Sequence, residues 1–409
     1  MPACRFCGAP LQHTVVDLGM SPLCESYLRA DQLDAMEPFF PLHVRVCTAC
    51  WLVQLPEYVP PEEIFREYAY FSAYSDSWVE HARRYAVAMV DRLELGRGSF
   101  VVEVASNDGY LLQHFVHAGI PVLGIEPARN VAPAAEARGV PTLTEFFGHD
   151  LARKVVDGHG SADLVVANNV LAQVPDLNDF VAGLAALVEP RTGVATLEFP
   201  HLLQLVDGHQ FDTIYHEHFS YFSLLTVDQV FAAHGLEVFD VEEIPTHGGS
   251  LRVHASHAGA YDVAGAVLDL HERERAAGVT SLAYYEAFAS RVVETKHRLV
   301  EFLVEQRRVG RRLAGYGAPG KGNTLLNYCG IRTDLLEFTV DRNPYKHGRY
   351  LPGTHIPIHH PDHLAEVRPD VILVLPWNLR DEIAAQLAYT RQWGARLYVP
   401  IPTVREVGA

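Results

Sequence analysis

The sequence predicts an α/β protein in three parts: a small N-terminal zinc-binding module and two open-sheet units behind it. Two C-x-x-C pairs lie within the first fifty residues, and two later stretches each alternate short β-branched runs with helical runs. Such alternation, with apolar strands, is typical of a doubly wound and mainly parallel sheet. We expect the three parts to cover residues 1–65, 66–262 and 263–409.

The composition is that of a soluble globular protein. The 409 residues are 48% apolar and 20% charged, with a formal net charge of -17. A negative field of that size repels phosphate backbones, so we expect no nucleic-acid partner. No apolar run approaches the ~20 residues of a membrane span, and the N-terminus lacks the features of a signal peptide. We therefore expect a cytoplasmic protein with reduced thiols, no membrane partner, and a monomer as the working oligomeric state.

The two C-x-x-C pairs predict a structural zinc site. Each pair offers two thiolates from a tight turn, and two such turns complete a tetrahedral site with four sulfur ligands. The predicted ligands are Cys4, Cys7, Cys47 and Cys50. Four sulfurs leave no open coordination position, so the metal would not be catalytic. The alternatives are two unrelated surface turns or a redox C-x-x-C. Cys24 and Cys329 are expected to be ordinary buried thiols.

The first sheet unit opens with an aromatic loop and an amphipathic helix between residues 64 and 95. Apolar β-branched runs then alternate with helical runs, and a hairpin closes the unit. Strands are predicted at 99–106, 122–127, 163–170, 193–200, 236–244 and 250–256, and helices at 109–119, 133–139 and 177–190.

A long helix predicted at 282–306 leads into the second, smaller unit. Its strands are predicted at 312–319, 336–343, 369–377 and 397–402, with a helix at 323–330. Ligands of open α/β sheets bind at the carboxyl ends of the strands, and often between domains. The cleft between the two units is therefore the expected active site.

One loop in the first unit has the features of a nucleoside site. Glu103 lies on the first strand, the loop "ASNDG" follows, and Glu126 comes about 20 residues later, where an acid can accept hydrogen bonds from ribose hydroxyls. The loop is not G-x-G-x-x-G, and it suits the amino-acid end of S-adenosylmethionine better than a pyrophosphate. The simpler alternative is an α/β fold that has an acid at a strand end.

A second loop competes with it. "GYGAPG" follows a strand in the second unit, and Asp341 ends the next strand about 20 residues later, which is a closer dinucleotide fingerprint. Lys321 follows this loop and can serve a diphosphate as a point charge. A nicotinamide-dependent oxidoreductase acting on a nucleotide sugar is therefore the alternative function, and a non-catalytic sugar-nucleotide-binding protein is another.

The motifs, taken in order along the whole chain, resemble those of the nucleotide-sugar C-methyltransferases of deoxysugar antibiotic pathways, such as those for mycarose, tetronitrose and noviose. They include "VEVASNDGYLL", "GIEPARNVA", "NNVLAQVPDL", "TIYHEHFSYFS", "THGGSLR" and "GYGAPGKGNTLLNY". The resemblance implies structural zinc, a Rossmann-like class I methyltransferase unit that binds S-adenosylmethionine, and a second Rossmann-like unit that helps to bind the sugar nucleotide. The implied reaction is methylation at C3 or C5 of a dTDP-4-keto-deoxysugar through an enolate.

The resemblance also implies a cofactor pocket around the "ASNDG" loop, with Glu126 on the cofactor ribose. Its expected residues are Glu103, Ala105, Ser106, Asn107, Gly109, Glu126, Pro127, Phe146, Phe147, Asn168 and Asn169.

The stretch "FDTIYHEHFSYFS" at 211–223 brings together a base, an acid and phenols. A sugar carbon becomes nucleophilic when a base removes a proton next to a ketone and donors stabilise the enolate oxygen. By resemblance, His218 is expected to be the base and Tyr215 to lie against the ketone. Glu217 is expected to orient or polarise the site, and Tyr70 to close it. If the stretch is extended, His216 and His218 share one face and Glu217 points away.

Two other readings of these histidines stay open. They can be satisfied core or surface residues, since the chain has 22 histidines. A metal site is disfavoured, because H-E-H spaces the two rings at i and i+2 rather than at i and i+4.

Gln173 is expected near the sugar, at a position where the family usually has histidine. Glutamine donates and accepts hydrogen bonds but cannot carry a proton near neutral pH. Either it only orients the substrate, or the sugar differs. Further substrate-binding residues are expected at Tyr74, Ser75, Glu198, His201, His247, Arg252, Lys321 and Asn323.

Overall fold

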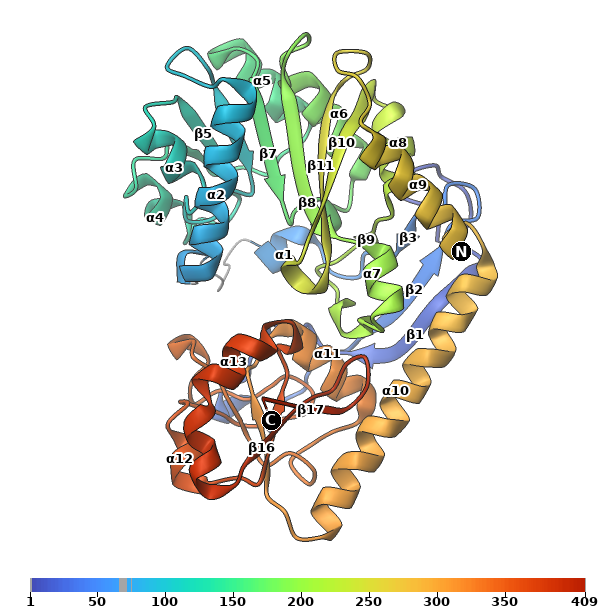
Figure 1. The fold of residues 1–409 in the computed structure, drawn as a ribbon, viewed down its shortest axis with the longest axis vertical. Coiled ribbons are helices and arrows are strands. Elements are labelled where there is room, and N and C mark those ends of the chain that lie inside the picture. The colour runs from blue at the N-terminus through green and yellow to red at the C-terminus, as the bar shows by residue number, and fades with distance from the viewer. Residues whose placement is uncertain (1, 66–71, 75, 409) are drawn as a thin grey trace.

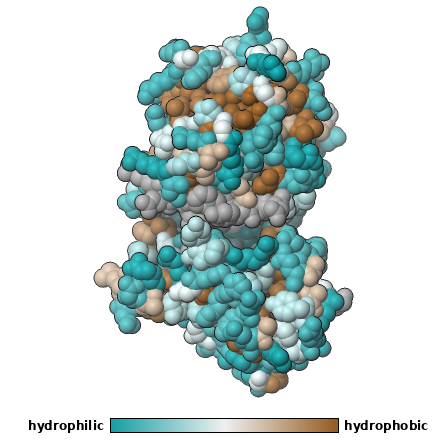
Figure 2. All heavy atoms as spheres, turned by 90° about the vertical axis from the view of Figure 1, so that its left-hand side faces the viewer, coloured by the Kyte–Doolittle hydropathy of each residue, from teal (hydrophilic) through white to brown (hydrophobic). Residues whose placement is uncertain are grey.

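The computed structural model describes residues 2–65, 72–74 and 76–408, and within them the chain forms sheets of four, seven and six strands. Figure 1 shows the central unit above, the C-terminal unit below and the N-terminal strands beside them. The surface narrows between the two larger units and is mostly hydrophilic on the side shown in Figure 2. The predicted three-part α/β architecture is confirmed.

The four-stranded sheet has the order β1-β2-β3-β9 and is antiparallel. Its first three strands come from the N-terminal module: β1 (His13–Ser21), β2 (Phe40–Val46) and β3 (Val53–Gln54). The fourth, β9 (Ser220–Tyr221), belongs to the stretch "FDTIYHEHFSYFS". The N-terminal sheet is therefore completed by residues from the predicted reaction segment. Short helical turns lie at η1 (Ala30–Gln32), α1 (Pro61–Phe65) and η2 (Ser72–Tyr74).

The seven-stranded sheet has the order β10-β11-β8-β7-β4-β5-β6. The five strands from β8 to β6 in this order are parallel, β11 is antiparallel to β8, and β10 is antiparallel to β11. The sheet is thus mainly parallel and closed by a hairpin, as the sequence predicts. The strands are β4 (Val101–Val104), β5 (Val122–Ile125), β6 (Thr142–Leu143), β7 (Leu164–Asn168), β8 (Val194–Pro200), β10 (Leu236–Ile244) and β11 (Ser250–His257).

Helices cover this sheet, and several of them were not predicted. The predicted ones are α2 (Asp76–Leu93), α3 (Leu112–His117), α4 (Ala132–Glu136) and α6 (Leu177–Leu187). The additional ones are α5 (His149–His159), α7 (Leu202–Asp207) and α8 (Leu224–Ala232), with turns η3 (Leu171–Gln173), η4 (Phe211–Thr213) and η5 (Thr246–Gly248).

The six-stranded sheet has the order β14-β13-β12-β15-β16-β17, parallel except for β17. Its strands are β12 (Leu313–Tyr316), β13 (Thr339–Val340), β14 (Ile358–His359), β15 (Val371–Val374), β16 (Arg396–Val399) and β17 (Arg405–Val407). Helices α9 (Gly265–Ala277) and α10 (Leu282–Arg308) lead into it. Its own helical segments are α11 (Gly320–Cys329), η6 (Pro344–Lys346), α12 (His363–Val367), η7 (Trp377–Leu379), α13 (Arg380–Gln386) and η8 (Ala388–Trp393).

The N-terminal module is divided between two hydrophobic cores. Val15, Leu42 and Val44 of its sheet share a core with Phe288 and Leu299 of α10 and with the C-terminal sheet. The residues around the C-x-x-C turns belong instead to the core of the central unit. The module is therefore packed between the two larger units rather than attached at one end.

Among the described helices, none is both long and apolar enough to span a membrane.

Candidate active site

A cavity of about 580 Å³ is lined by residues of all three parts of the chain. Val104, Ile125 and Asn168, at the carboxyl ends of three neighbouring parallel strands, form one side. Gly320 and Lys321, at the N-terminus of α11, lie on another side. The cavity thus occupies the position that open α/β sheets offer to ligands.

Most of the expected cofactor residues line one part of this cavity. They are Ala105, Asn107, Glu126, Pro127, Phe146, Phe147, Asn168 and Asn169. Ala105, Asn107 and Asn169 have positive φ angles, so their loops turn sharply at the strand ends. Burial raises the pKa of Glu126, and its carboxylate accepts hydrogen bonds from the Asn107 amide at 2.9 Å and the Ala128 amide at 2.8 Å. These two amides fix the direction of the carboxylate.

Three expected cofactor residues, one on the strand β4 and two in the loop after it, do not line the cavity. Glu103 is 1% exposed, and burial together with nearby Glu126 raises its pKa well above the usual range. Ser106 is fully buried. Gly109 has φ of +75°, and a Cβ there would lie 3.1 Å from the Ala135 Cα. These residues affect the conformation of the loop without facing the cavity.

Tyr215, Glu217 and His218 all line the cavity. The segment is not extended: residues 216 and 217 form a turn. The extended form, in which His216 and His218 would share one face and Glu217 would point away, is therefore not the form found. His216 instead lies against the N-terminal sheet, with Nε2 3.3 Å from the Pro41 carbonyl oxygen.

The ring of His218 lies against the ring of Tyr215, with the two centroids 4.1 Å apart. Nδ1 of His218 is 3.0 Å from the carbonyl oxygen of Thr213. A carbonyl oxygen only accepts, so Nδ1 carries the proton and Nε2 keeps its lone pair in the neutral ring. Burial lowers the pKa of His218 to about 4, which keeps the ring neutral. The arrangement is that of a neutral base beside a phenol.

Glu217 lies in a different environment. Its Oε1 is 3.7 Å from the Cys24 thiol, and both side chains are buried. Burial and the nearby Glu25 raise the pKa of Glu217 to about 8. Lys346 lies 3.8 Å from Glu25, and its positive charge offsets part of this rise in the pKa of Glu217. A pKa of about 8 favours the protonated form of Glu217 at neutral pH.

Of the expected substrate residues, His247 and Lys321 line the cavity, as does Gln173. Nζ of Lys321 donates to Asn378 Oδ1 at 2.9 Å and lies 4.9 Å from the centre of the Trp377 indole ring. Burial lowers the pKa of Lys321, and it lowers the pKa of His247 to about 4.

Other expected substrate residues are buried and bond to other side chains of the protein. The structure does not bring them to the cavity wall. Glu198 is completely buried and bonds His81 at 3.1 Å and Arg252 at 2.8 Å. His201 is also buried, with Nε2 2.7 Å from Glu274, whose carboxylate also accepts two backbone amides at the start of α8. Glu198 and Nε2 of His201 thus find partners within the protein, as buried polar groups require, whereas Nδ1 of His201 is buried without one among the described residues.

Asn323 lies behind the cavity wall, where its amide donates to the Cys24 carbonyl oxygen. Tyr70 and Ser75 lie outside the described residues, and for Tyr74 the structure describes the backbone turn η2.

Several residues that line the cavity were not predicted. Cys24 and Glu25 enter it from the N-terminal module, and Asn378 enters it from the C-terminal unit. Trp78 also lines it, stacked on His81 at 5.0 Å and edge-on to His247 at 5.4 Å. A signal for Trp78 was its place in the aromatic stretch that leads into the first turn of α2, whereas Cys24 and Glu25 had none.

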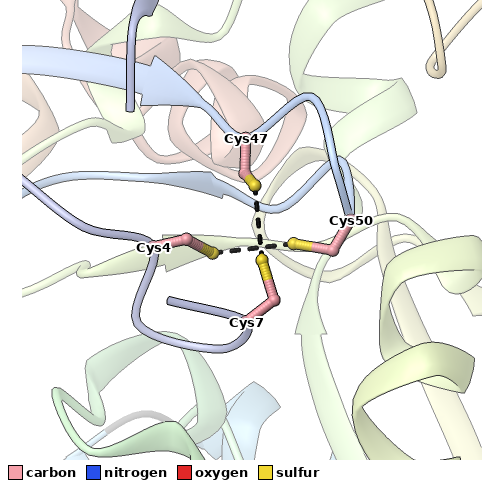
Figure 3. A group of neighbouring side chains, drawn as sticks. All are labelled: Cys4, Cys7, Cys47 and Cys50. Carbon is pink, nitrogen blue, oxygen red and sulfur yellow. Dashed lines mark hydrogen bonds between the residues drawn. The ribbon is translucent and has the colours of Figure 1, made fainter. Parts of the chain in front are cut away.

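The four paired cysteines converge on one point (Figure 3). All four sulfurs lie within 4.8 Å of one another, with Cys4 and Cys50 at 3.6 Å and Cys7 and Cys47 at 3.5 Å. Zinc–sulfur bonds are about 2.3 Å long, so sulfurs this close fit a tetrahedral zinc ion. The Gln54 side-chain amide donates to the Cys4 sulfur at 3.1 Å, a supporting contact for a thiolate ligand.

Comparison with known proteins gives matches along the chain. A zinc binding domain matches residues 4–65, a methyltransferase domain matches 78–241, and a C-methyltransferase C-terminal domain matches 245–402. The chain is 38% identical over 407 residues to C-methyltransferase NovU from Streptomyces niveus, covering 99% of this chain and 97% of that one.

Similar solved structures cover less of the chain. One is magnesium protoporphyrin IX methyltransferase from Synechocystis PCC 6803 with bound SAH, with 16% identity and a TM-score of 0.36 over 44% of this chain and 83% of that chain. Another is an S-adenosylmethionine-dependent methyltransferase from Clostridium acetobutylicum, with 10% identity and a TM-score of 0.36 over 44% of this chain and 92% of that chain.

Proposed function

This chain belongs to the C-methyltransferase family, with S-adenosylmethionine as its cofactor and a zinc-binding N-terminal domain, and on that premise we propose that it methylates a carbon next to the ketone of a nucleotide-linked deoxysugar. The proposed substrate class is a dTDP-4-keto-deoxysugar, methylated at C3 or C5. The adjacent rings of Tyr215 and His218 in the cavity wall, tilted by 35° to each other, carry this proposal.

His218 is proposed as the base. Its Nδ1 proton bonds Thr213, so Nε2 can accept the proton from the carbon next to the ketone. The hydroxyl of Tyr215 is proposed to donate a hydrogen bond to the enolate oxygen that forms, and the protonated Glu217 is proposed to orient the same part of the sugar. S-adenosylmethionine supplies the methyl group that the nucleophilic carbon takes.

The cofactor is proposed to lie along the loops after β4, β5 and β7. Glu126 is held by two backbone amides and keeps carboxylate lone pairs for the ribose hydroxyls. The rings of Phe146 and Phe147 and the amides of Asn168 and Asn169 complete this side. Gln173, at the end of η3, also lines the cavity and is proposed to orient the sugar by hydrogen bonds.

The diphosphate is proposed to lie at the N-terminus of α11, near Lys321. A helix N-terminus and a lysine both favour negative charge. The glycine-rich loop before α11 is closed by protein groups: the Ala318 carbonyl oxygen accepts from Tyr27 at 2.6 Å and from Lys346 at 2.8 Å, and its amide donates to Asp341 at 2.7 Å. Asp341 thus supports the loop, which leaves it unavailable to a nicotinamide dinucleotide.

The cytoplasm is the proposed location. Four cysteines can hold zinc only while they are reduced, and the cytoplasm keeps thiols reduced.

Mass spectrometry tests the proposal directly. Purified protein is incubated with S-adenosylmethionine and dTDP-4-keto-6-deoxyglucose, with the C2-deoxy and 3-amino analogues in parallel. The expected result is a product heavier by one methylene group and stoichiometric S-adenosylhomocysteine. Formation of a product methylated on oxygen or nitrogen, or no product with any keto sugar, would count against the proposal. NMR of the product then identifies the methylated carbon.

A further inference from the structure

One side chain in the first C-x-x-C turn reaches from the zinc site to the reaction segment. Arg5 stands between the ligands Cys4 and Cys7. Its guanidinium donates to the Pro175 carbonyl oxygen at 2.9 Å and to the carbonyl oxygen of Leu55, the residue after β3. The same group lies 5.4 Å from the centre of the Phe219 ring. Phe219 directly follows His218.

The backbone of Phe219 is held from both sides. Its carbonyl oxygen accepts from the Leu55 amide at 3.0 Å, and its amide donates to the Ala172 carbonyl oxygen at 2.7 Å. Ala172 and Pro175 both line the cavity. Arg5 therefore contacts the ring of Phe219 and also the two segments that hold the Phe219 backbone. These are the residue after β3 and the cavity loop, which comprises residues 172–175.

The zinc site fixes the other end of Arg5. The Arg5 amide donates to Gln54 Oε1 at 2.9 Å, and the Gln54 amide group donates to the Cys4 sulfur at 3.1 Å. Gln54 is 1% exposed, and its backbone pairs with Ser220 of β9. Asn178 of α6 also donates to the Phe6 carbonyl oxygen at 2.9 Å. The turn that carries Arg5 is thus tied to the central unit by several hydrogen bonds.

We propose that Arg5 is a positioning residue for the methyl transfer: anchored by the zinc turn, it holds the Pro175 loop and the Phe219 ring so that His218 faces the cofactor side of the cavity. This inference rests on the proposed function in assigning the reaction to His218. It gives the zinc module a part in the geometry of the active site. A bidentate cation suits this position, because one planar guanidinium can serve two carbonyl oxygens while its face lies on an aromatic ring.

The experiment compares Arg5→Met and Arg5→Lys with the control Arg45→Met. Arg45 lies on β2 of the same sheet, and its guanidinium bonds His43 at 3.2 Å rather than the cavity loop. Five quantities are measured: zinc per chain, hydrogen exchange of residues 171–175 and 215–222 by mass spectrometry, the affinity for S-adenosylhomocysteine, and both kcat and KM with the dTDP-keto sugar.

The expected result for Arg5→Met is one zinc per chain but amide exchange of residues 215–222 faster by about tenfold or more, because the segment loses its brace. Turnover should fall between about tenfold and a hundredfold, as for a misplaced catalytic group, while the affinity for S-adenosylhomocysteine changes less than about threefold. Arg5→Lys should recover part of the exchange protection and turnover, because an ammonium can reach one carbonyl oxygen at a time. Arg45→Met should match the wild type.

Unchanged exchange of residues 215–222 in Arg5→Met, or an equal change in Arg45→Met, would overturn the inference. If Arg5→Met does not fold, Arg5→Lys gives the same comparison. If the wild type methylates no keto sugar, the proposed function fails, and the exchange measurement still decides whether Arg5 braces the segment.

Discussion

The imidazole of His218 is packed between the Thr213 carbonyl oxygen, which is 3.0 Å from Nδ1, and the ring of Tyr215, whose centroid is 4.1 Å away. We expect His218→Asn to lower turnover by about 100-fold or more, because asparagine cannot accept the proton. Binding of S-adenosylhomocysteine should be nearly unchanged, since its expected contacts lie on other loops. Turnover is measured by mass spectrometry and binding by calorimetry.

His216→Asn is the matched control, because His216 faces the Pro41 carbonyl oxygen rather than the cavity. It should alter thermal stability more than turnover. With S-adenosylhomocysteine bound, the wild type should exchange deuterium from solvent into the carbon next to the ketone, and His218→Asn should not. A variant His218→Asn that works at the wild-type rate, beside an inactive His216→Asn, would contradict the assignment of the base.

Glu217 should make the stability of the protein depend on pH. Burial raises its pKa to about 8, whereas an unfolded glutamate has a pKa of ~4.3. Between these values the native state holds a proton that the unfolded chain has released. The stabilising contribution is therefore complete below about pH 4 and is lost as pH rises through about 8. The groups around it are Cys24, Glu25 and Lys346.

Urea unfolding of the wild type and Glu217→Gln at several pH values measures this effect. Glutamine is neutral throughout, so the free energy of unfolding of the wild type should fall relative to that of Glu217→Gln between about pH 5 and pH 8. A difference between the two proteins that stays constant over this range would show that Glu217 has an ordinary pKa.

Cys47→Ser should lose most of the bound zinc, because a serine hydroxyl is a poor substitute for a thiolate ligand. We expect the free energy of unfolding to drop by several kcal/mol, since zinc binding contributes directly to folding, up to ~10–16 kcal/mol in small zinc domains. Metal analysis and thermal unfolding measure the two effects. Cys329→Ser, a buried thiol on α11 away from the cluster, should keep one zinc per chain. Freshly purified wild type with well under one zinc would refute the site.

Glu126→Ala should weaken binding of S-adenosylmethionine by roughly 10- to 100-fold, the effect of removing hydrogen bonds to a charged group. Glu145→Ala, an exposed acid at the rim of the same cavity, should change the affinity by less than about threefold. Calorimetry gives both values. The same instrument should detect no heat with NAD, and tight NAD binding that disappears in Gly317→Ala would revive the oxidoreductase.

The sheets were predictable because their sequence pattern is local. Apolar β-branched runs at 101–104, 122–125 and 164–168 form strands wherever they can be covered on both faces, and the helices between them supply that cover. The C-x-x-C turns are likewise local, because each motif of four residues predicts two zinc ligands. The strand β9 was not predictable, because two residues become a strand only where β3 offers an unpaired edge.

The candidate site was predictable where the residue type itself indicates chemistry, as for His218 and Tyr215. The site was not predictable where a polar side chain bonds to another side chain inside the protein instead of facing the cavity. Glu198 and His201 follow the rule for strand ends, yet Glu198 pairs with Arg252, His201 contacts Glu274, and both lie behind the cavity wall. Cys24 lines the cavity because the N-terminal module packs against the two larger units there. Nothing in the sequence around Cys24 predicts that contact.

The division of the N-terminal module between two cores has a consequence for synthesis on the ribosome. Its cysteines can bind metal as soon as they emerge, but the core that holds Leu42 and Val44 is complete only after Phe288 and Leu299 of α10 have been made. At 5–20 residues per second, that delay is roughly 10–50 s. During this interval the nascent chain carries a strand pair with an uncovered apolar face, so the first part to be translated is among the last to be buried.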